Sequence, residues 1–318
     1  MQASLLPPTS PSAVSRLRAL IAAPAFWDWP TIAVFAGCAA LWAGAMLLPE
    51  GWGMLQLPLL ILALTLHSSL THEILHGHPF RSDRAGTALG MIQPGLFVPY
   101  LRFRALHLAH HRDSKLTDPY DDPESNYLDP VVWAGLPRWW RAVLICNNTL
   151  LGRILVGPAI GMWAFVKGDI LRFREGERVV ALHWLAHLPG VALTLWLVSL
   201  SAVPLWLYLL ACYGAMSVLR IRTFLEHQAH ERALGRSVVI EDRGLLAFLF
   251  LNNNYHLVHH THPGLSWYRL PGIYRARRER FLRMNGGYAY RSYGAVFRQF
   301  LLRCKDPVAH PLWQGPRN

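Results

Sequence analysis

The sequence predicts an all-α integral membrane protein in which four transmembrane helices form two hairpins, and a cytosolic helical cap carries a histidine-rich site for two metal ions. Three observations lead to this prediction: an apolar composition, four long apolar stretches and three histidine boxes. Of the 318 residues, 53% are hydrophobic and only 16% are charged, and the mean hydropathy is +0.21. That balance is typical of a chain that crosses a membrane rather than of a soluble domain.

Four apolar stretches, residues 31–48, 53–70, 179–200 and 204–219, are each long enough to cross the hydrocarbon layer as a helix, some with little margin. The short linkers inside the two pairs contain no Lys or Arg. The basic residues lie in the N-terminal tail, in the middle segment and beyond the fourth stretch. The positive-inside rule therefore predicts that both termini and the middle segment face the cytosol, and we expect the inner membrane of a bacterium.

The chain divides into a cytosolic tail over residues 1–26, a membrane domain that holds the metal site over 27–270, and a basic cytosolic segment over 271–318. We expect no secretory signal peptide, because the proline-containing tail lacks an apolar core. The run 90–101 is apolar but short and contains two prolines, which predicts a re-entrant or interfacial piece. The tryptophan-containing region 131–170 predicts interfacial helices.

Eight histidines fall into three boxes with the sequences HEILH, HLAHH and HLVHH. They are His72, His76, His107, His110, His111, His256, His259 and His260. Spacings of three and four residues place imidazoles on one face of a helix, and imidazole is a ligand of iron, copper, zinc and nickel. Eight converging imidazoles exceed the ligands of one four-coordinate zinc ion, so we interpret the boxes as a site for two adjacent metal ions. The predicted topology places all three boxes on the same side of the membrane.

These boxes resemble those of the integral-membrane fatty acid desaturase superfamily, which also contains alkane hydroxylases and carotenoid hydroxylases and ketolases. The resemblance rests on HEILHGHP at 72–79, HLAHHRDSKLTDPYDDPES at 107–125 and NNNYHLVHHTHP at 252–263. It implies a non-haem centre of two iron ions, with O2 as co-substrate and two electrons from an external donor. It also implies a further histidine ligand after the fourth span. The Glu226–His227 pair assigns this role to His227, and His230 is the alternative.

Residues beside the boxes are expected to orient the ligands, because a metal-bound histidine usually donates its other ring N–H to a carboxylate or a carbonyl. In the acidic run after the second box, Asp118 and Asp122 are our first choices; a solvated turn or a contact for a cationic substrate is also compatible with this run. Asn252 precedes His256 by four residues, so a continuing helix would direct it to the metal side, and a helix cap is the alternative. Glu226 completes this set. We assign no catalytic residue beyond the metal centre.

Two other histidines, His183 and His187, repeat the spacing of four within the third span, and we expect them to be packing residues. Four scattered cysteines without a CxxC pair predict reduced thiols rather than disulfides. The net charge of +12 includes an arginine cluster near the C-terminus. Because no nucleic-acid-binding fold accompanies this cluster, it fits membrane lipids with anionic headgroups, or an acidic electron-transfer protein, better than nucleic acid.

Together these inferences predict an O2-dependent oxidoreductase, and we favour desaturation of a fatty-acyl chain. Hydroxylation or ketolation of a lipid, isoprenoid or alkane remains open, as does oxidation of a small amino-acid or amine-like substrate. We recognise no fused redox module, which predicts a separate donor of the ferredoxin or rubredoxin type.

The sequence HExxH in the first box also matches intramembrane zinc proteases, but that function leaves the other boxes unexplained. A metal transporter would need polar residues within the spans, which are mostly apolar.

Overall fold

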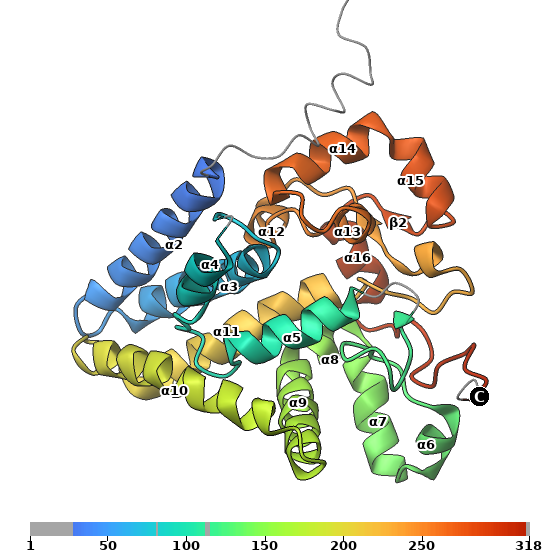
Figure 1. The fold of residues 1–318 in the computed structure, drawn as a ribbon, viewed down its shortest axis with the longest axis horizontal. Helices are drawn as coiled ribbons and strands as arrows, with labels where there is room; N and C mark the ends of the chain where they lie inside the picture. Colours follow the sequence, from blue (N-terminus) through green and yellow to red (C-terminus); the bar gives the residue numbers. More distant parts are fainter. Residues whose placement is uncertain (1–27, 81, 112–114, 316–318) are drawn as a thin grey trace, which may run out of the picture.

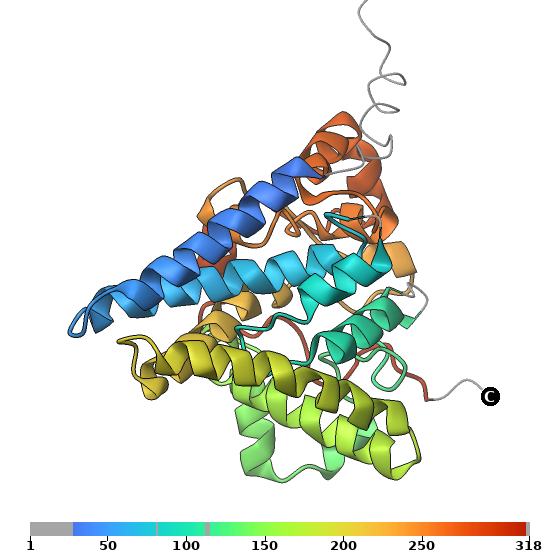
Figure 2. The ribbon, with the colours of Figure 1, turned by 60° about the vertical axis from the view of Figure 1, so that its left-hand side comes forward.

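Two long helical hairpins form the frame of the molecule. The computed structural model describes residues 28–80, 82–111 and 115–315, so the predicted N-terminal tail lies outside the described residues. The first hairpin pairs α2 (Trp29–Leu47) with α3 (Gly53–Leu75), and the second pairs α10 (Arg178–Ser199) with α11 (Leu205–Thr223). The turns of both hairpins lie at the same end of the molecule, at the left of Figures 1 and 2.

All four helices are long and apolar enough to cross a membrane, which confirms the predicted spans. α3 lies between α2 and α11 and packs against both. Its apolar side chains share one core with α11, in which Leu60 and Leu64 lie against Leu207 and Ala211. Helix α3 also continues past residue 70, where the apolar stretch ends, and its last turns therefore carry the first histidine box.

The predicted re-entrant piece follows α4 (Asp83–Gly90) as an irregular segment that leads into α5 (Tyr100–His110). Its carbonyl groups are hydrogen-bonded by side chains of the second hairpin. Tyr208 Oη donates to the carbonyl of Pro94 at 2.8 Å, and His187 Nε2 donates to that of Leu96 at 2.7 Å. These bonds satisfy backbone groups that would be costly to leave unpaired between apolar helices. They also give His187 the structural role expected for it.

Four further helices precede the second hairpin: α6 (Pro130–Gly135), α7 (Arg138–Asn147), α8 (Leu150–Leu155) and α9 (Gly157–Arg174). Large apolar side chains stand out from them, including Trp139 and Trp163, which are 68% and 66% exposed. Such exposure is compatible with the interfacial placement that the sequence predicts, because exposed tryptophans favour the boundary between lipid and water.

A cap of short elements covers the end opposite to the hairpin turns, in orange and red at the upper right of Figure 1. It contains η2 (Ala233–Arg236), α12 (Leu245–Leu249), α13 (His256–Thr261), η3 (Trp267–Arg269), α14 (Leu270–Ala276), α15 (Arg278–Met284) and α16 (Tyr293–Phe300). Strand β1 (Val239–Ile240) pairs in parallel with β2 (Ala289–Tyr290). The predicted boundary at residue 270 separates segments that share a core, because Tyr274 and Phe281 pack with Leu257 and Val258.

Candidate metal centre

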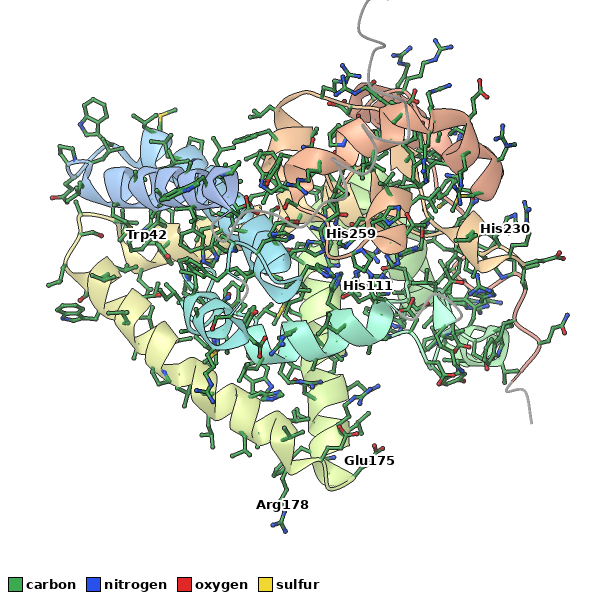
Figure 3. The ribbon with its side chains drawn as sticks, turned by 45° about the horizontal axis from the view of Figure 1, so that its top comes forward. Trp42, His111, Glu175, Arg178, His230 and His259 are labelled. Carbon is green, nitrogen blue, oxygen red and sulfur yellow. The ribbon has the colours of Figure 1, made fainter. Side chains whose placement is uncertain are left out.

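Nine histidines converge into two adjacent groups near the middle of the molecule, where Figure 3 labels His111 and His259. Group one contains His72, His76, His107, His111 and His259. Group two contains His110, His227, His256 and His260. Within each group, one ring nitrogen from every residue lies within 4.8 Å of the others. The two groups touch, since the rings of His111 and His260 stack with their centroids 4.3 Å apart.

Helical spacing explains how the boxes divide between the groups. His107 on α5 and His111, the C-cap residue of this helix, are four residues apart and join group one, whereas His110 lies between them and turns toward group two. On α13, His256 and His260 join group two and His259 joins group one. A spacing of four keeps two side chains on one face of a helix, and the additional residue projects to its side. Each HxxHH box therefore serves both groups.

The ninth histidine comes from the irregular chain that follows α11. His227 directs Nε2 toward group two, 2.9 Å from His110 Nε2 and 3.0 Å from His256 Nε2. Its Nδ1 lies 3.2 Å from Ser237 Oγ, and Lys305 Nζ donates to its backbone carbonyl. His230 lies outside both groups, and its Nδ1 accepts the backbone N–H of Arg232 at 3.0 Å. The structure thus brings His227, and not His230, to the cluster.

Carboxylates hold two rings of the second box. His110 Nδ1 lies 2.7 Å from Asp122 Oδ1, and His107 Nδ1 lies 3.0 Å from Glu124 Oε1. Because a carboxylate accepts the Nδ1 proton in each pair, the neutral form of each ring carries its lone pair on Nε2 and directs it to the cluster, which is the tautomer a metal ligand needs. Asp118 is not used in this way, since its Oδ1 accepts the backbone N–H groups of Tyr120 and Asp121 at 2.9 Å within a turn.

The third box is oriented by a different neighbour from the one expected. α13 begins at His256, so no helix continues back to Asn252. The backbone of Asn252 has a φ of 55°, and its Nδ2 donates to the carbonyl of Trp267 at 3.3 Å. Asn253 takes the place beside the ring instead, with Oδ1 3.1 Å from His256 Nδ1. Glu226 Oε1 lies 3.6 Å from the same nitrogen, which is beyond hydrogen-bonding distance, and 3.0 Å from Arg222 Nε, so its role toward the ring stays a prediction.

Sequence reasoning missed three of the groups that contact the rings: Glu124, Asn253 and Ser237. Glu124 belongs to the acidic run already singled out, and its backbone N–H donates to Asp122 Oδ1 at 2.9 Å, which brings the two carboxylates side by side. Asn253 belongs to the polar run NNN before the third box, which indicates the run but not which of its members contacts the ring. For Ser237 the sequence carries no signal, because it reaches His227 through an isolated antiparallel bridge.

Burial keeps most of the rings neutral. It lowers the pKa of His76, His111, His227, His256 and His259 well below the ordinary value, and the neighbouring histidines add to the effect. For His110 burial acts in the same direction, but Glu124 and Asp122 outweigh it and raise the pKa to about 9. Neutral imidazole is the form that binds a metal, and a ring beside carboxylates is the one that best tolerates added positive charge.

The facing Nε2 atoms of the two histidine groups are better suited to binding metal ions than to hydrogen bonding with one another. Five Nε2 pairs face each other at 2.9–3.1 Å, including His107 with His111 and His256 with His260. Where Nδ1 carries the proton, both facing atoms offer lone pairs. The Nε2 atoms of His72 and His76 are buried and have no hydrogen-bond partner among the described residues. Lone pairs that converge in this way are satisfied by a shared cation, and two groups provide for two cations.

Comparison with known proteins defines the class. The sequence matches the fatty acid desaturase family over residues 50–293, and the chain therefore belongs to that family. It is also similar to a β-carotene ketolase of Paracoccus sp. (strain N81106 / MBIC 01143), with 26% identity over 215 residues that cover 64% of this chain and 71% of the ketolase. Both findings indicate an oxidoreductase and decide against the zinc protease suggested by HExxH, which would need only one group of ligands.

Proposed function

We propose that the protein is an O2-dependent di-iron oxidase that desaturates a fatty-acyl chain, with electrons from a separate carrier protein. The observation that supports this function is the convergence of nine imidazoles into two touching groups beside the end of an apolar span. Two iron ions bound there would supply the oxidation of an unactivated C–H bond by O2. The nine histidines would hold them, five around one ion and four around the other.

The surrounding residues have two tasks in this proposal. Glu124, Asp122 and Asn253 fix the rings, so that the ligand geometry does not depend on the metal alone. Burial of the rings excludes water, which strengthens electrostatic interactions and prevents side reactions. Overall, the substrate loses two hydrogen atoms, the carrier supplies two electrons, two protons come from water, and one O2 becomes two water molecules.

A second candidate is oxidation of an isoprenoid lipid by hydroxylation and ketone formation, and the similarity to a β-carotene ketolase favours it. Hydroxylation uses the same O2, electrons and protons, but one oxygen atom enters the substrate and one water is formed. A ketone requires a second hydroxylation at the same carbon, with another O2, two electrons and two protons, followed by loss of water. The two outcomes differ in how the substrate is held relative to the reacting centre, because small displacements change which step follows the first C–H cleavage. In either case we propose that the metal site faces the cytosol and draws its substrate from the membrane.

Mass spectrometry of lipids extracted from cells that express the protein tests these functions. Desaturation predicts acyl chains lighter by two mass units, hydroxylation predicts a gain of sixteen, and ketone formation a gain of fourteen. A His110→Ala variant expressed at the same level should give none of these products. Iron-loaded protein that consumes no O2 with reductant and either acyl lipids or carotenoids would contradict both candidates.

A further inference from the structure

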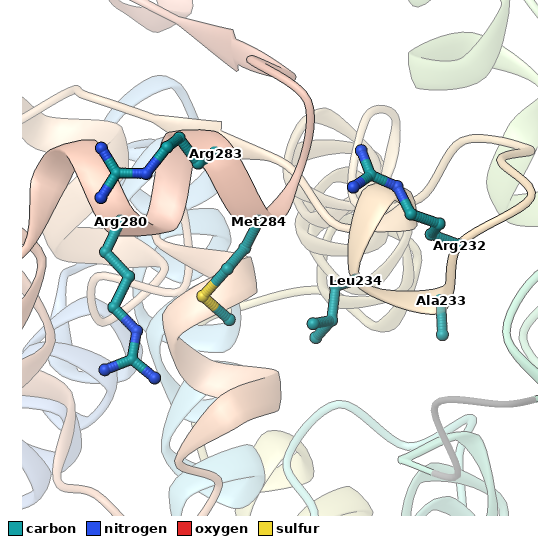
Figure 4. Close-up of a pocket in the computed structure, with 6 residues that line it drawn as sticks. All are labelled: Arg232, Ala233, Leu234, Arg280, Arg283 and Met284. Atoms are coloured by element: carbon teal, nitrogen blue, oxygen red, sulfur yellow. The ribbon is translucent and has the colours of Figure 1, made fainter.

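A basic pocket lies at the surface of the cap, between η2 and α15, as Figure 4 shows. It has a volume of about 560 Å³. Three arginines and three less polar side chains line it: Arg232, Ala233, Leu234, Arg280, Arg283 and Met284. The pocket is outside the two histidine groups, and nothing in the proposed chemistry uses its residues.

The charges of this pocket are available to a partner. Arg232 and Arg280 are exposed, and within the described parts of the chain no carboxylate lies at ion-pair distance from either. Arg283 approaches Glu279 at 3.7 Å, but both side chains are largely exposed, so this pair neutralises little of its charge. Leu234 is 41% exposed and supplies an apolar patch between the guanidinium groups. Arginines around an apolar centre fit an acidic protein surface, and small interfaces of this kind are typical of redox partners.

A chain of hydrogen bonds leads from the wall of this pocket to group two. Met284 is followed by Asn285, which is 1% exposed and donates from Nδ2 to the carbonyl of Ser237 at 3.1 Å. Ser237 Oγ lies 3.2 Å from His227 Nδ1. The Nε2 of His227 then faces His110 at 2.9 Å. Electrons tunnel more readily through bonds and hydrogen bonds than across open gaps, and this route contains no open gap.

Building on the proposed function, we propose that an acidic one-electron carrier protein docks at this pocket and that Asn285, Ser237 and His227 form the route of its electron. Each docking event oxidises the carrier by one electron and reduces the metal site by one, so two events supply the two electrons of one turnover. Anionic lipid headgroups would use the same positive charge, but they would not require a bonded route that ends at a ring of group two. The route therefore favours a redox protein.

Binding of an oxidised plant-type [2Fe–2S] ferredoxin to the full chain in phosphatidylcholine nanodiscs tests the docking surface. The double variant Arg232→Glu/Arg280→Glu should weaken the Kd at least about tenfold at low salt, and high salt should remove the difference. The matched control is Arg174→Glu/Arg178→Glu, which changes the net charge equally at the α9–α10 turn, far from His230 in Figure 3. The control should leave the Kd unchanged. An unchanged Kd for ferredoxin in the pocket variant would overturn the proposal. It would also be overturned if the pocket substitutions weakened only the binding of phosphatidylglycerol and not the binding of ferredoxin.

The route has its own test in stopped-flow reduction of the iron-loaded protein by saturating reduced ferredoxin. Ser237→Ala should slow the reduction per bound iron several-fold with the Kd for ferredoxin unchanged, and Ser237→Thr, which keeps the hydroxyl group, should restore the rate per bound iron. Equal rates in all three proteins would overturn the route.

Single-turnover assays separate this inference from the proposed function. Protein that is reduced with dithionite, freed of dithionite and then exposed to O2 should oxidise lipid equally well with and without the pocket substitutions. If the wild-type protein forms no product under these conditions, the proposed function fails while the docking result stands. If both proteins form product but ferredoxin binds them equally, the docking proposal fails alone.

Discussion

Single residues decide whether the rings can act as ligands. Asp122 and Glu124 accept the Nδ1 protons of two neighbouring histidines, so the lone pairs of these rings are directed to the centre of the cluster. Removing a ligand and removing a residue that orients one should therefore have effects of different size. The first leaves an open coordination position, and the second leaves the ligand present but poorly aimed.

Substitution of a ligand should abolish the site. We expect His110→Ala to lower the iron content of the purified protein and to abolish turnover, because group two then keeps only three histidines. His183→Ala is the matched control, since His183 lies in α10 and belongs to neither group. Metal analysis with O2 consumption measures both. Equal loss of iron from the two variants would show that the metal ligands have been assigned incorrectly.

Substitution of an orienting carboxylate should weaken the site without abolishing it. Glu124→Gln removes the acceptor charge from His107 and should lower the affinity for metal by about 10- to 100-fold. Asp121→Asn, in the same acidic run but paired with Lys115 at the surface, should leave it unchanged. Competition with a chelator while metal content is monitored gives both values. A larger effect from Asp121→Asn would contradict the assigned geometry.

The sequence predicts that the histidine boxes converge, but it predicts only some of the residues that contact their rings. Spacings of three and four predict which histidines share a face, and the structure brings together all nine that were expected as ligands. Asn253 could not be preferred over Asn252, because the choice depends on two residues with positive φ, Leu251 and Asn252, which end the helical periodicity just before the third box. Local turns of this kind depend on tertiary contacts that no sequence pattern records.

At the scale of elements, α5 is the critical helix, because it contributes to both groups at once. A buried ion pair fixes its first half to α9. Arg102 Nε donates to Asp169 Oδ1 at 3.0 Å, and Trp184 Nε1 of α10 donates to Asp169 Oδ2 at 2.8 Å. One carboxylate therefore connects three helices, and any shift of α5 would move His107, His110 and His111 together.

Breaking this ion pair should destabilise the protein more than replacing both partners. Asp169→Asn leaves the guanidinium of Arg102 buried and uncompensated, which should cost about 3–5 kcal/mol and lower the iron content. The double variant Arg102→Met/Asp169→Leu should recover much of that loss, since neither charge remains. Thermal unfolding in detergent compares the three proteins. Equal melting temperatures in Asp169→Asn and the wild type would show that the pair contributes little.

At the scale of the whole molecule, charge and apolar surface are separated along the long helices. Both hairpin turns lie at one end. The first histidine box lies at the end of α3 that is away from its hairpin turn. The turn between α2 and α3 contains Glu50 and no basic residue, and the turn between α10 and α11 contains no charged residue. Arginines flank the turn between α9 and α10, at the opposite end of α10. This separation supports our proposal that the metal site faces the cytosol.

Labelling from one side of the membrane tests this orientation. In a background without Cys146 and Cys304, Glu50→Cys should react with an impermeant maleimide added outside intact cells, and Glu175→Cys should react only after the cells are opened. Both positions are exposed at turns, so access to the reagent is comparable. The reverse pattern would place the histidine groups outside the cytosol.

The contact between Lys305 and the carbonyl of His227 has a consequence for biogenesis. Lys305 donates a hydrogen bond to the loop that carries His227, and the ring of His227 belongs to group two. The first box lies more than two hundred residues before Lys305 in the chain. During synthesis the first spans are inserted into the membrane long before Lys305 has been added to the chain. Metal loading should accordingly be a late event, completed only after translation has passed this lysine, and a ribosome-bound intermediate that stops short of it should hold iron loosely.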